Sequence, residues 1–412
     1  MMTRRSALGA VAAGALHAAV ERDYFPPPDK QGGWRALTAK DKIRRIGGME
    51  PDKLDATFEY AKTSSQHGGL VVVRHGWIVY ENYFGRGNRE AAPESRSCGK
   101  CISSICTGMA IQEKRAMIPG GLETKIMTAK YLPPDFLPLD DPRKAEIKLG
   151  HILCMSSGLR GNSPGYVNGK PVTIDPPDPT HALQITDEGA RMVLQTSLWC
   201  DPGGGYSYCS PGTQFLSILV RRLMGMELGE YFRRRIAEPS GWGEWDWAMY
   251  RPKLTAGIDS NGRLLHTPAA GSICLKAADA LRFMYLLLHE GRWGNQQLVP
   301  AEYIRIASKR IKYNTHYPYS LQFNVNGDGH MQAPRDAYYK SGAGGFSWYV
   351  VPSLDLIAYK IAGVDADYDP SISRLPVRYK YDGSRDGVAI DRKIQSESVE
   401  KTLEKLVDAV TA

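Results

Sequence analysis

Hydrophobic residues recur along the chain in two different rhythms, one typical of strands and one typical of helices. The β-rich runs 69–73 and 78–80 flank a short turn that contains Gly76, a pattern that predicts a hairpin. Further strands are expected near the other end of the chain, over residues 319–325, 347–351 and 356–361.

Helical spacing of hydrophobic residues dominates elsewhere. Leu54, Phe58 and Ala61 recur at intervals of three or four and predict a helix over residues 51–64. The segment 396–410 carries its hydrophobic residues on one face, which predicts an amphipathic helix. Further helices are expected over residues 97–115, 216–224 and 277–290, and residues 20–45, rich in Pro and Gly, are expected to form an extended arm.

Strands at both ends of the sequence with helices between them predict an α/β (α+β) fold. We expect one mainly antiparallel sheet built from both termini, with flanking helices and an all-helical insertion. The expected boundaries are a leader over 1–20, the N-terminal part of the α/β domain over 21–104, a mainly helical domain over 105–290 and the C-terminal part over 291–412. A cleft between two such parts is a natural ligand site.

Composition narrows the class of protein. Hydrophobic residues make up 42% of the 412 residues and charged residues 23%, ordinary values for a soluble globular protein. No run of about eighteen apolar residues predicts a membrane span. The net charge of +8 is spread in short basic runs without interleaved aromatic residues, so we expect no nucleic-acid partner. The charge indicates a mild preference for anionic substrates or an anionic cell surface.

The N-terminus has the pattern of an export signal. Arg4 and Arg5 precede a short, small and apolar stretch that runs to Ala19, interrupted by His17. This pattern predicts a secretory leader, and the paired arginines suggest the twin-arginine route. We therefore expect a periplasmic or secreted protein. The alternative is an Ala-rich terminal helix on a cytoplasmic protein.

Seven cysteines, at 98, 101, 106, 154, 200, 209 and 274, leave an odd number of thiols. Cys98 and Cys101 form a C-x-x-C, but no second pair follows at the spacing of zinc ligands. We expect no metal and no other cofactor, and we expect most of these cysteines to be buried free thiols. A bridge between Cys200 and Cys209 stays open on sequence grounds.

The chemistry is concentrated in a few residues. Ser97-Cys98-Gly99-Lys100 is an S-x-x-K motif at the start of a predicted helix. Residues three apart share a helix face, about 5–6 Å apart at Cβ. A neutral Lys100 at that distance can accept the proton of Ser97, and the helix start offers backbone N–H groups to an oxyanion.

Two further motifs follow in order, together with two auxiliary segments. The chain continues with Tyr208-Cys209-Ser210 and with Lys340-Ser341-Gly342, and also contains the segments 151–159 (HILCMSSGL) and 269–272 (AAGS). The series S-x-x-K, Y-x-S, K-S-G resembles the signature of the serine β-lactamase and penicillin-binding protein superfamily over about residues 50–365. The second motif begins with tyrosine here. In this respect the chain resembles class C β-lactamases, D,D-peptidases, β-lactamase-like carboxylesterases and 6-aminohexanoate-oligomer (nylon-oligomer) hydrolases.

The resemblance implies a role for each matching residue. Ser97 would attack the substrate and form an acyl-enzyme, with Lys100 as its general base or hydrogen-bond partner. Tyr208 would pass the proton to the leaving group and later activate water. The backbone N–H groups of Ser97 and Ala343 would form the oxyanion hole. The substrate-binding residues implied are Ser210, Lys340, Ser341 and Gly342, with Lys340 beside the tyrosine or a substrate carboxylate.

Departures from the pattern shape the expected activity. Ser210 stands where many β-lactamases have asparagine, and Cys101 stands where serine or threonine is usual. No glutamate of the class A kind is apparent between 160 and 200, so water activation would fall to Tyr208. We expect a carboxylesterase or amidase acting on small molecules. The alternatives are a β-lactamase or a D,D- or D-amino peptidase acting on cell-wall-like substrates, and a non-catalytic binding protein that retains the fold.

Overall fold

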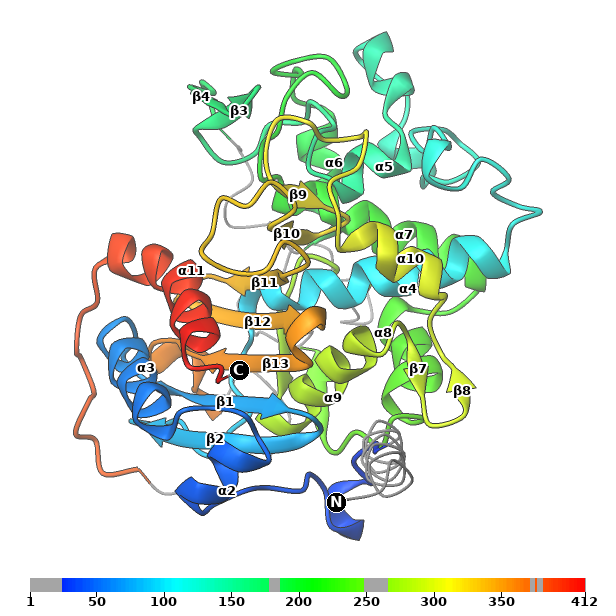
Figure 1. Ribbon diagram of the computed structural model, residues 1–412. Helices are drawn as coiled ribbons and strands as arrows, with labels where there is room; N and C mark the ends of the chain where they lie inside the picture. The colour runs from blue at the N-terminus through cyan, green and yellow to red at the C-terminus, as the bar shows by residue number, and fades with distance from the viewer. Residues whose placement is uncertain (1–23, 178–185, 248–265, 371–374, 376–380, 412) are drawn as a thin grey trace, which may run out of the picture.

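One seven-stranded antiparallel sheet organises the molecule, as the computed structural model shows (Figure 1). The structure describes residues 24–177, 186–247, 266–370, 375 and 381–411. The strand order is β2-β1-β13-β12-β11-β10-β9. The strands are β1 (Gly68–Arg74), β2 (Trp77–Phe84), β9 (Tyr319–Ser320), β10 (Phe323–Val325), β11 (Tyr338–Gly342), β12 (Phe346–Val351) and β13 (Leu356–Ile361).

The two ends of the chain meet in the middle of this sheet. Strand β1 pairs with β13 from Gly69↔Ile361 to Arg74↔Leu356, so the expected single sheet from both termini is confirmed. Alternate residues of the central strands pack on opposite faces. Leu70 and Ala358 belong to the smaller core under α3 (Pro51–Thr63) and α11 (Arg392–Asp408), while Val71 and Ile357 belong to the large core.

Helices from the middle of the chain cover the other face of the sheet and extend beyond it (Figure 1). Helix α9 (Ala277–Leu288) packs on β12 and β13, and α4 (Gly99–Glu113) packs against α7 (Ser210–Met224). All residues of α4 from 99 to 110 are buried, so α4 is the central helix of the molecule. The other α-helices of the described residues are α2 (Lys40–Arg45), α5 (Leu149–Leu153), α6 (Asp187–Leu194), α8 (Leu228–Phe232) and α10 (Ala301–Ala307).

Three two-stranded antiparallel sheets lie outside the large sheet. They pair β3 (Gly165–Val167) with β4 (Lys170–Val172), β5 (Trp245–Trp247) with β6 (Ile273–Leu275), and β7 (Arg292–Trp293) with β8 (Gln296–Gln297). The expected α/β fold is therefore confirmed, with an antiparallel sheet and helices in two parts. The exact domain boundaries stay a prediction.

Three elements differ from the sequence-based expectations. The strand expected over 319–325 is two short strands, because Leu321 and Gln322 have positive φ and turn the chain back on itself. The helix expected from Ser97 starts as a 3₁₀ turn, and α4 begins at Gly99. The arm expected over 20–45 is not wholly extended, since α2 lies within it.

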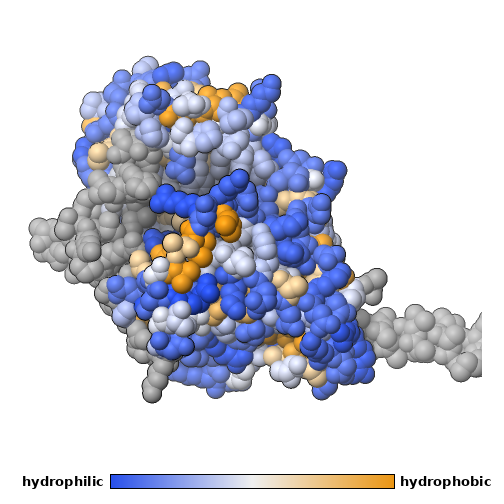
Figure 2. All heavy atoms as spheres, turned by 90° about the vertical axis from the view of Figure 1, so that its left-hand side faces the viewer, coloured by the Kyte–Doolittle hydropathy of each residue, from blue (hydrophilic) through white to orange (hydrophobic). Residues whose placement is uncertain are grey.

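The surface that carries α3, α11 and the β3–β4 hairpin is mostly hydrophilic, with a small hydrophobic group near its middle (Figure 2). None of the helices in the described ranges is long and apolar enough to cross a membrane. The expected leader lies outside the described residues. No disulfide joins the cysteines, all of which the structure describes, so Cys200 and Cys209 do not form a bridge.

Candidate active site

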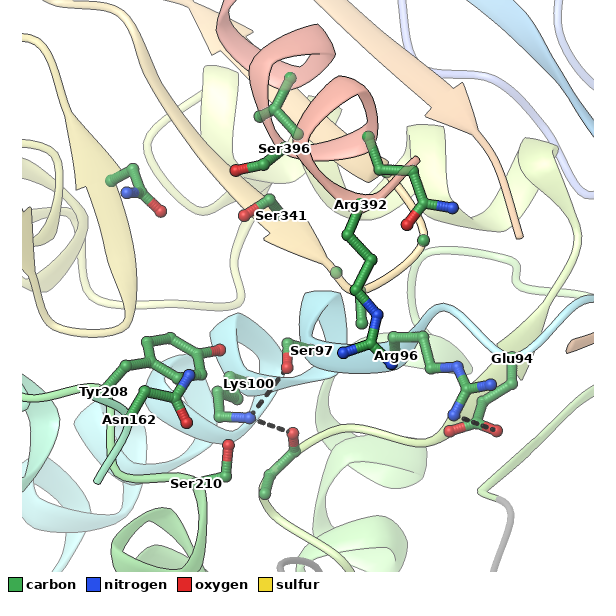
Figure 3. Close-up of a pocket in the computed structure, with 18 of the residues that line it drawn as sticks. Glu94, Arg96, Ser97, Lys100, Asn162, Tyr208, Ser210, Ser341, Arg392 and Ser396 are labelled. Carbon is green, nitrogen blue, oxygen red and sulfur yellow. Dashed lines mark hydrogen bonds and ion pairs between the residues drawn. The ribbon is translucent and has the colours of Figure 1, made fainter. Parts of the chain in front are cut away.

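The three sequence motifs meet at one cleft of about 1020 Å³. The start of α4, the start of α7, the end of β11 and the first turns of α11 surround it (Figure 3). The motif residues that line it are Ser97, Lys100, Tyr208, Ser210, Ser341, Gly342 and Ala343.

Ser97 lies at a sharp change of backbone direction. The preceding residue, Arg96, has a φ of 53°, a left-handed backbone conformation that residues other than glycine rarely adopt. The 3₁₀ turn Arg96–Cys98 then leads into α4. Such local strain often occurs at functional sites. Lys100 lies on the first turn of α4 and its Nζ donates a hydrogen bond to Ser97 Oγ at 3.1 Å. The carbonyl oxygen of Ala270 accepts a second hydrogen bond from Lys100.

Two glycines let other segments approach the backbone of this turn. An ideal Cβ on Gly271 would lie 2.4 Å from the carbonyl oxygen of Arg96, and one on Gly342 would lie 2.5 Å from that of Ser95. Both positions would also come within 3.3 Å of the backbone nitrogen of Ser97. Because Gly271 and Gly342 have no side chains, the 269–272 segment and strand β11 can pack directly against the backbone of this turn. We call this close packing the clamp.

Gly271→Ala is expected to disrupt this clamp. The methyl group would collide with backbone rather than with a flexible side chain, and φ at this position is 143°, which strains an alanine. We expect hydrolytic activity to fall by at least about tenfold, because small displacements of reacting groups are costly, and the melting temperature to fall. Gly225→Ala is the matched control, since it has a positive φ but nothing within 4 Å of its Cβ position. Equal activity loss in the two variants would contradict this account.

Lys100 is buried, with 1% of its surface exposed. Burial lowers its pKa from the ordinary value, and the charge of nearby Lys340 lowers it further, against the opposing influence of Tyr208. A lysine whose pKa is depressed can be neutral and can accept a proton near neutral pH. Lys100 thus has the environment that general-base chemistry requires.

Tyr208 lies just before α7, and its carbonyl oxygen accepts a hydrogen bond from the backbone N–H of Asn162 at 3.0 Å. Burial alone would raise the pKa of its phenol. The charges of Lys100 and Lys340, together with hydrogen bonds from Ser97 and Lys340, outweigh burial and lower the pKa of Tyr208 to about 8. A substantial share of Tyr208 is therefore phenolate at slightly alkaline pH.

Lys340 lies behind the tyrosine rather than on the cleft wall. Its side chain is 1% exposed and is not among the groups that line the cleft. Its Nζ donates hydrogen bonds to the hydroxyl oxygens of Tyr208 at 3.2 Å and Tyr319 at 2.8 Å. Of the two positions that the sequence left open for Lys340, the structure shows the one beside the tyrosine.

Two arginines of the cleft were not among the residues that the sequence analysis singled out. Arg96 forms ion pairs with Asp367 and Glu94, which hold the strained residue before Ser97. Arg392, on the first turn of α11, extends toward Ser97 in Figure 3. The hydrophobic face of α11 was visible in the sequence, but which polar residue at its start reaches the cleft depends on tertiary packing.

The C-x-x-C cysteines do not take part in the cleft. Cys98 and Cys101 are fully buried, and burial raises the pKa of both thiols well above the usual range. A thiol is a weak nucleophile until it ionises. Neither cysteine therefore competes with Ser97 as the nucleophile.

In the described part of the chain, one group of three side chains has ligand atoms close enough to hold a metal ion, and it is made of His67, Asp365 and Asp386. It resembles a metal site in composition only. The Arg86 guanidinium forms ion pairs with both Asp365, at 3.3 Å, and Asp386, at 2.9 Å. A cation therefore already neutralises these carboxylates, and the cluster lies outside the cleft residues.

A serine and a lysine one helical turn apart, facing a tyrosine of low pKa between a sheet and a helical region, define the β-lactamase-like serine hydrolases. The chain belongs to the beta-lactamase family, whose model matches residues 54–362. No curated protein matches the sequence.

Solved structures share the fold at low sequence identity. One is a beta-lactamase/D-alanine carboxypeptidase from Yersinia pestis, 16% identical with a TM-score of 0.56, covering 86% of this chain and 98% of that chain. EstCE1, a hydrolase with promiscuous acyltransferase activity, is 15% identical with a TM-score of 0.56, covering 78% and 97%. A penicillin-binding protein homologue from Caulobacter crescentus is 15% identical with a TM-score of 0.52, covering 75% and 91%.

Proposed function

We propose that the protein is a serine hydrolase that cleaves esters or amides of small molecules through an acyl-enzyme on Ser97. The observation that carries the proposal is the hydrogen-bonded arrangement of Ser97, Lys100 and Tyr208, in which the pKa values of both potential bases are depressed. A non-catalytic binding protein has no need to maintain such an arrangement.

Acylation follows from these contacts. Ser97 Oγ attacks the substrate carbonyl while its proton passes to Lys100 or to the Tyr208 phenolate, both of which lie within its hydrogen-bonding network. The backbone N–H groups of Ser97 and Ala343 stabilise the tetrahedral oxyanion. Tyr208, which takes the Ser97 proton directly or receives it from Lys100, then gives it to the leaving group, and the Ser97 ester remains on the enzyme.

Deacylation uses the same groups in reverse. With the leaving group gone, Tyr208 is the base that removes a proton from an incoming water molecule. Lys340, which bonds to Tyr208 from behind the cleft, favours the phenolate form through its positive charge. Regeneration of Ser97 closes the cycle without any cofactor.

Esters are the favoured substrates because an alkoxide or phenoxide leaves with less proton assistance than an amine. A β-lactam acyl-enzyme also requires a well-placed water and a grip on the amide side chain. Ser210 lines the cleft where many β-lactamases have asparagine, which weakens that grip. Arg392 lines the cleft and favours a negatively charged substrate, so a β-lactamase or D-amino peptidase remains the second candidate.

Comparing two substrates on one preparation tests this ranking. We expect a larger kcat/KM for p-nitrophenyl butyrate than for nitrocefin, since the ester tolerates imperfect positioning better than the lactam does. Ser97→Ala protein serves as the control for background hydrolysis of the ester. A larger kcat/KM for nitrocefin would reverse the order of the two candidate activities.

A further inference from the structure

A buried lysine on the central strand β13 has no part in the chemistry described above. Among the described residues, the buried lysines are Lys100, Lys144, Lys340 and Lys360. Lys144 pairs with Asp140, and the two catalytic-site lysines bond to hydroxyl groups. Lys360 differs because, within the described part of the chain, the hydrogen bond of its Nζ goes to a backbone carbonyl alone, that of Gly345 at 2.7 Å, with no side chain as a partner.

Gly345 belongs to the loop 343–345 that joins β11 to β12 and borders the cleft. This loop carries Ala343, whose N–H group is the proposed second donor of the oxyanion hole. Gly344 and Gly345 have φ values of 85° and 94°, so the glycines themselves constrain the loop little. A turn bond from Gly345 N to Gly342 O, 3.2 Å long, holds one side of the loop, and Lys360 holds the other.

The position of Lys360 is costly for the fold. Its side chain is fully buried, and burial lowers its pKa to about 7, with nearby Cys98 acting in the opposite direction. Neighbouring strand residues on the same face, Leu356 and Ala358, are apolar. An apolar residue at 360 would therefore suit this core better than a lysine does.

We propose that Lys360 is a positioning residue that holds the Gly345 carbonyl and thereby aims the Ala343 N–H group at the oxyanion. The proposal rests on the acyl-enzyme function given above. Lys360 does not line the cleft and contacts no reacting atom, so it acts only through the loop. A side chain that lowers the stability of the fold while it fixes a glycine-containing loop of the site is typical of a trade-off between stability and activity.

The titratable and charged groups near Lys360 come from several elements. Cys98 of the 3₁₀ turn acts on the pKa of Lys360 and opposes the effect of burial. Tyr349 of β12 donates its hydroxyl to the Val399 carbonyl, and Glu400 of α11 accepts a hydrogen bond from Tyr339. Helix α11 also carries Arg392, which extends toward Ser97. Opposite Lys360, β1 presents Leu70 and α3 presents apolar side chains.

Lys360→Met separates positioning from packing. We expect kcat for p-nitrophenyl butyrate at pH 7.5 to fall at least about tenfold, because a displaced oxyanion donor weakens transition-state stabilisation. KM should change less than about threefold, since ground-state binding does not use this donor. The melting temperature should stay equal or rise, although activity falls.

The pH dependence of that stability gain has a definite sign. The unfolded chain keeps the lysine protonated up to about pH 10.5, whereas in the folded protein it loses its proton near pH 7. The cost of burying Lys360 is therefore complete below pH 7 and disappears as pH rises toward 10.5. The melting temperature of Lys360→Met should exceed that of the wild type by more at pH 6 than at pH 9.

Gly345→Ala provides a second, independent variant. Its Cβ would lie 2.8 Å from Lys360 Nζ and would displace the same contact from the loop side. If both changes act on one contact, the double variant should lose no more activity than the worse single variant. Multiplicative losses in the double variant, or a Lys360→Met enzyme with unchanged kcat, would overturn the proposal. Failure of the wild type to be labelled at Ser97 by a fluorophosphonate would instead overturn the proposed function.

Discussion

Ser97→Ala is expected to reduce kcat/KM for p-nitrophenyl butyrate by at least about a thousandfold. The methyl group cannot form the acyl-enzyme, and only the binding and oxyanion contributions to catalysis remain. The melting temperature should change little, because Ser97 is partly exposed and the principal loss is one hydrogen bond with Lys100. Steady-state kinetics and thermal unfolding of the same preparation measure both effects.

Ser396→Ala is the matched control for this experiment. Ser396 lines the same cleft from α11, but it is not part of the hydrogen-bonded group around the nucleophile. We expect it to retain activity within a few fold of the wild type. If the Ser97→Ala variant kept as much hydrolytic activity as the Ser396→Ala variant, a residue other than Ser97 would be the nucleophile.

Tyr208→Phe should lower kcat by a factor of about 10² to 10⁴, the usual contribution of a general acid–base group. The wild-type pH profile should show the base directly. Because the pKa of Tyr208 is about 8 and the phenolate is the active form, kcat/KM should fall as pH is lowered through about 8. The variant should lose this limb of the profile.

Tyr206→Phe tests whether the effect is specific to one phenol. Tyr206 lines the same cleft, and its ring stacks on Tyr317 with centroids 4.4 Å apart. Burial raises the pKa of Tyr206 well above the usual range, so its hydroxyl cannot serve as a base. We expect the pH profile of this control to match that of the wild type. A Tyr208→Phe enzyme that keeps the limb near pH 8 would assign the base to another group, with Lys100 the first to examine.

Much of this site could be predicted from the sequence, because its chemistry is local. Ser97 and Lys100 lie one helical turn apart, so their proximity follows from helix geometry alone. The meeting of Tyr208 with them was predicted only through the resemblance to a family. Nothing in the spacing of residues 100 and 208 determines that distance.

The parts that could not be predicted depend on tertiary packing. The turn between β9 and β10 requires positive φ values at Leu321 and Gln322. Leucine and glutamine rarely have positive φ, so the sequence gives no sign of this turn. Lys340 is buried with its Nζ hydrogen-bonded to the hydroxyl of Tyr319, a residue on a different strand, and the sequence does not show that these two residues meet. Lys360 looks like an ordinary charged residue in sequence, and only the pairing of β13 between β1 and β12 shows that it is buried.

Covalent modification of the nucleophile is the most direct test of the account, because Ser97 would attack the phosphorus of a fluorophosphonate as it attacks a substrate carbonyl. Intact-protein mass spectrometry after brief exposure to a fluorophosphonate, followed by peptide mapping, measures both the number of adducts and their position. We predict one adduct per chain, located on Ser97 and absent from Ser97→Ala, with Cys98 and Cys101 unmodified because burial suppresses their ionisation. An adduct on either cysteine, or an unmodified Ser97 in protein that hydrolyses p-nitrophenyl butyrate, would contradict it.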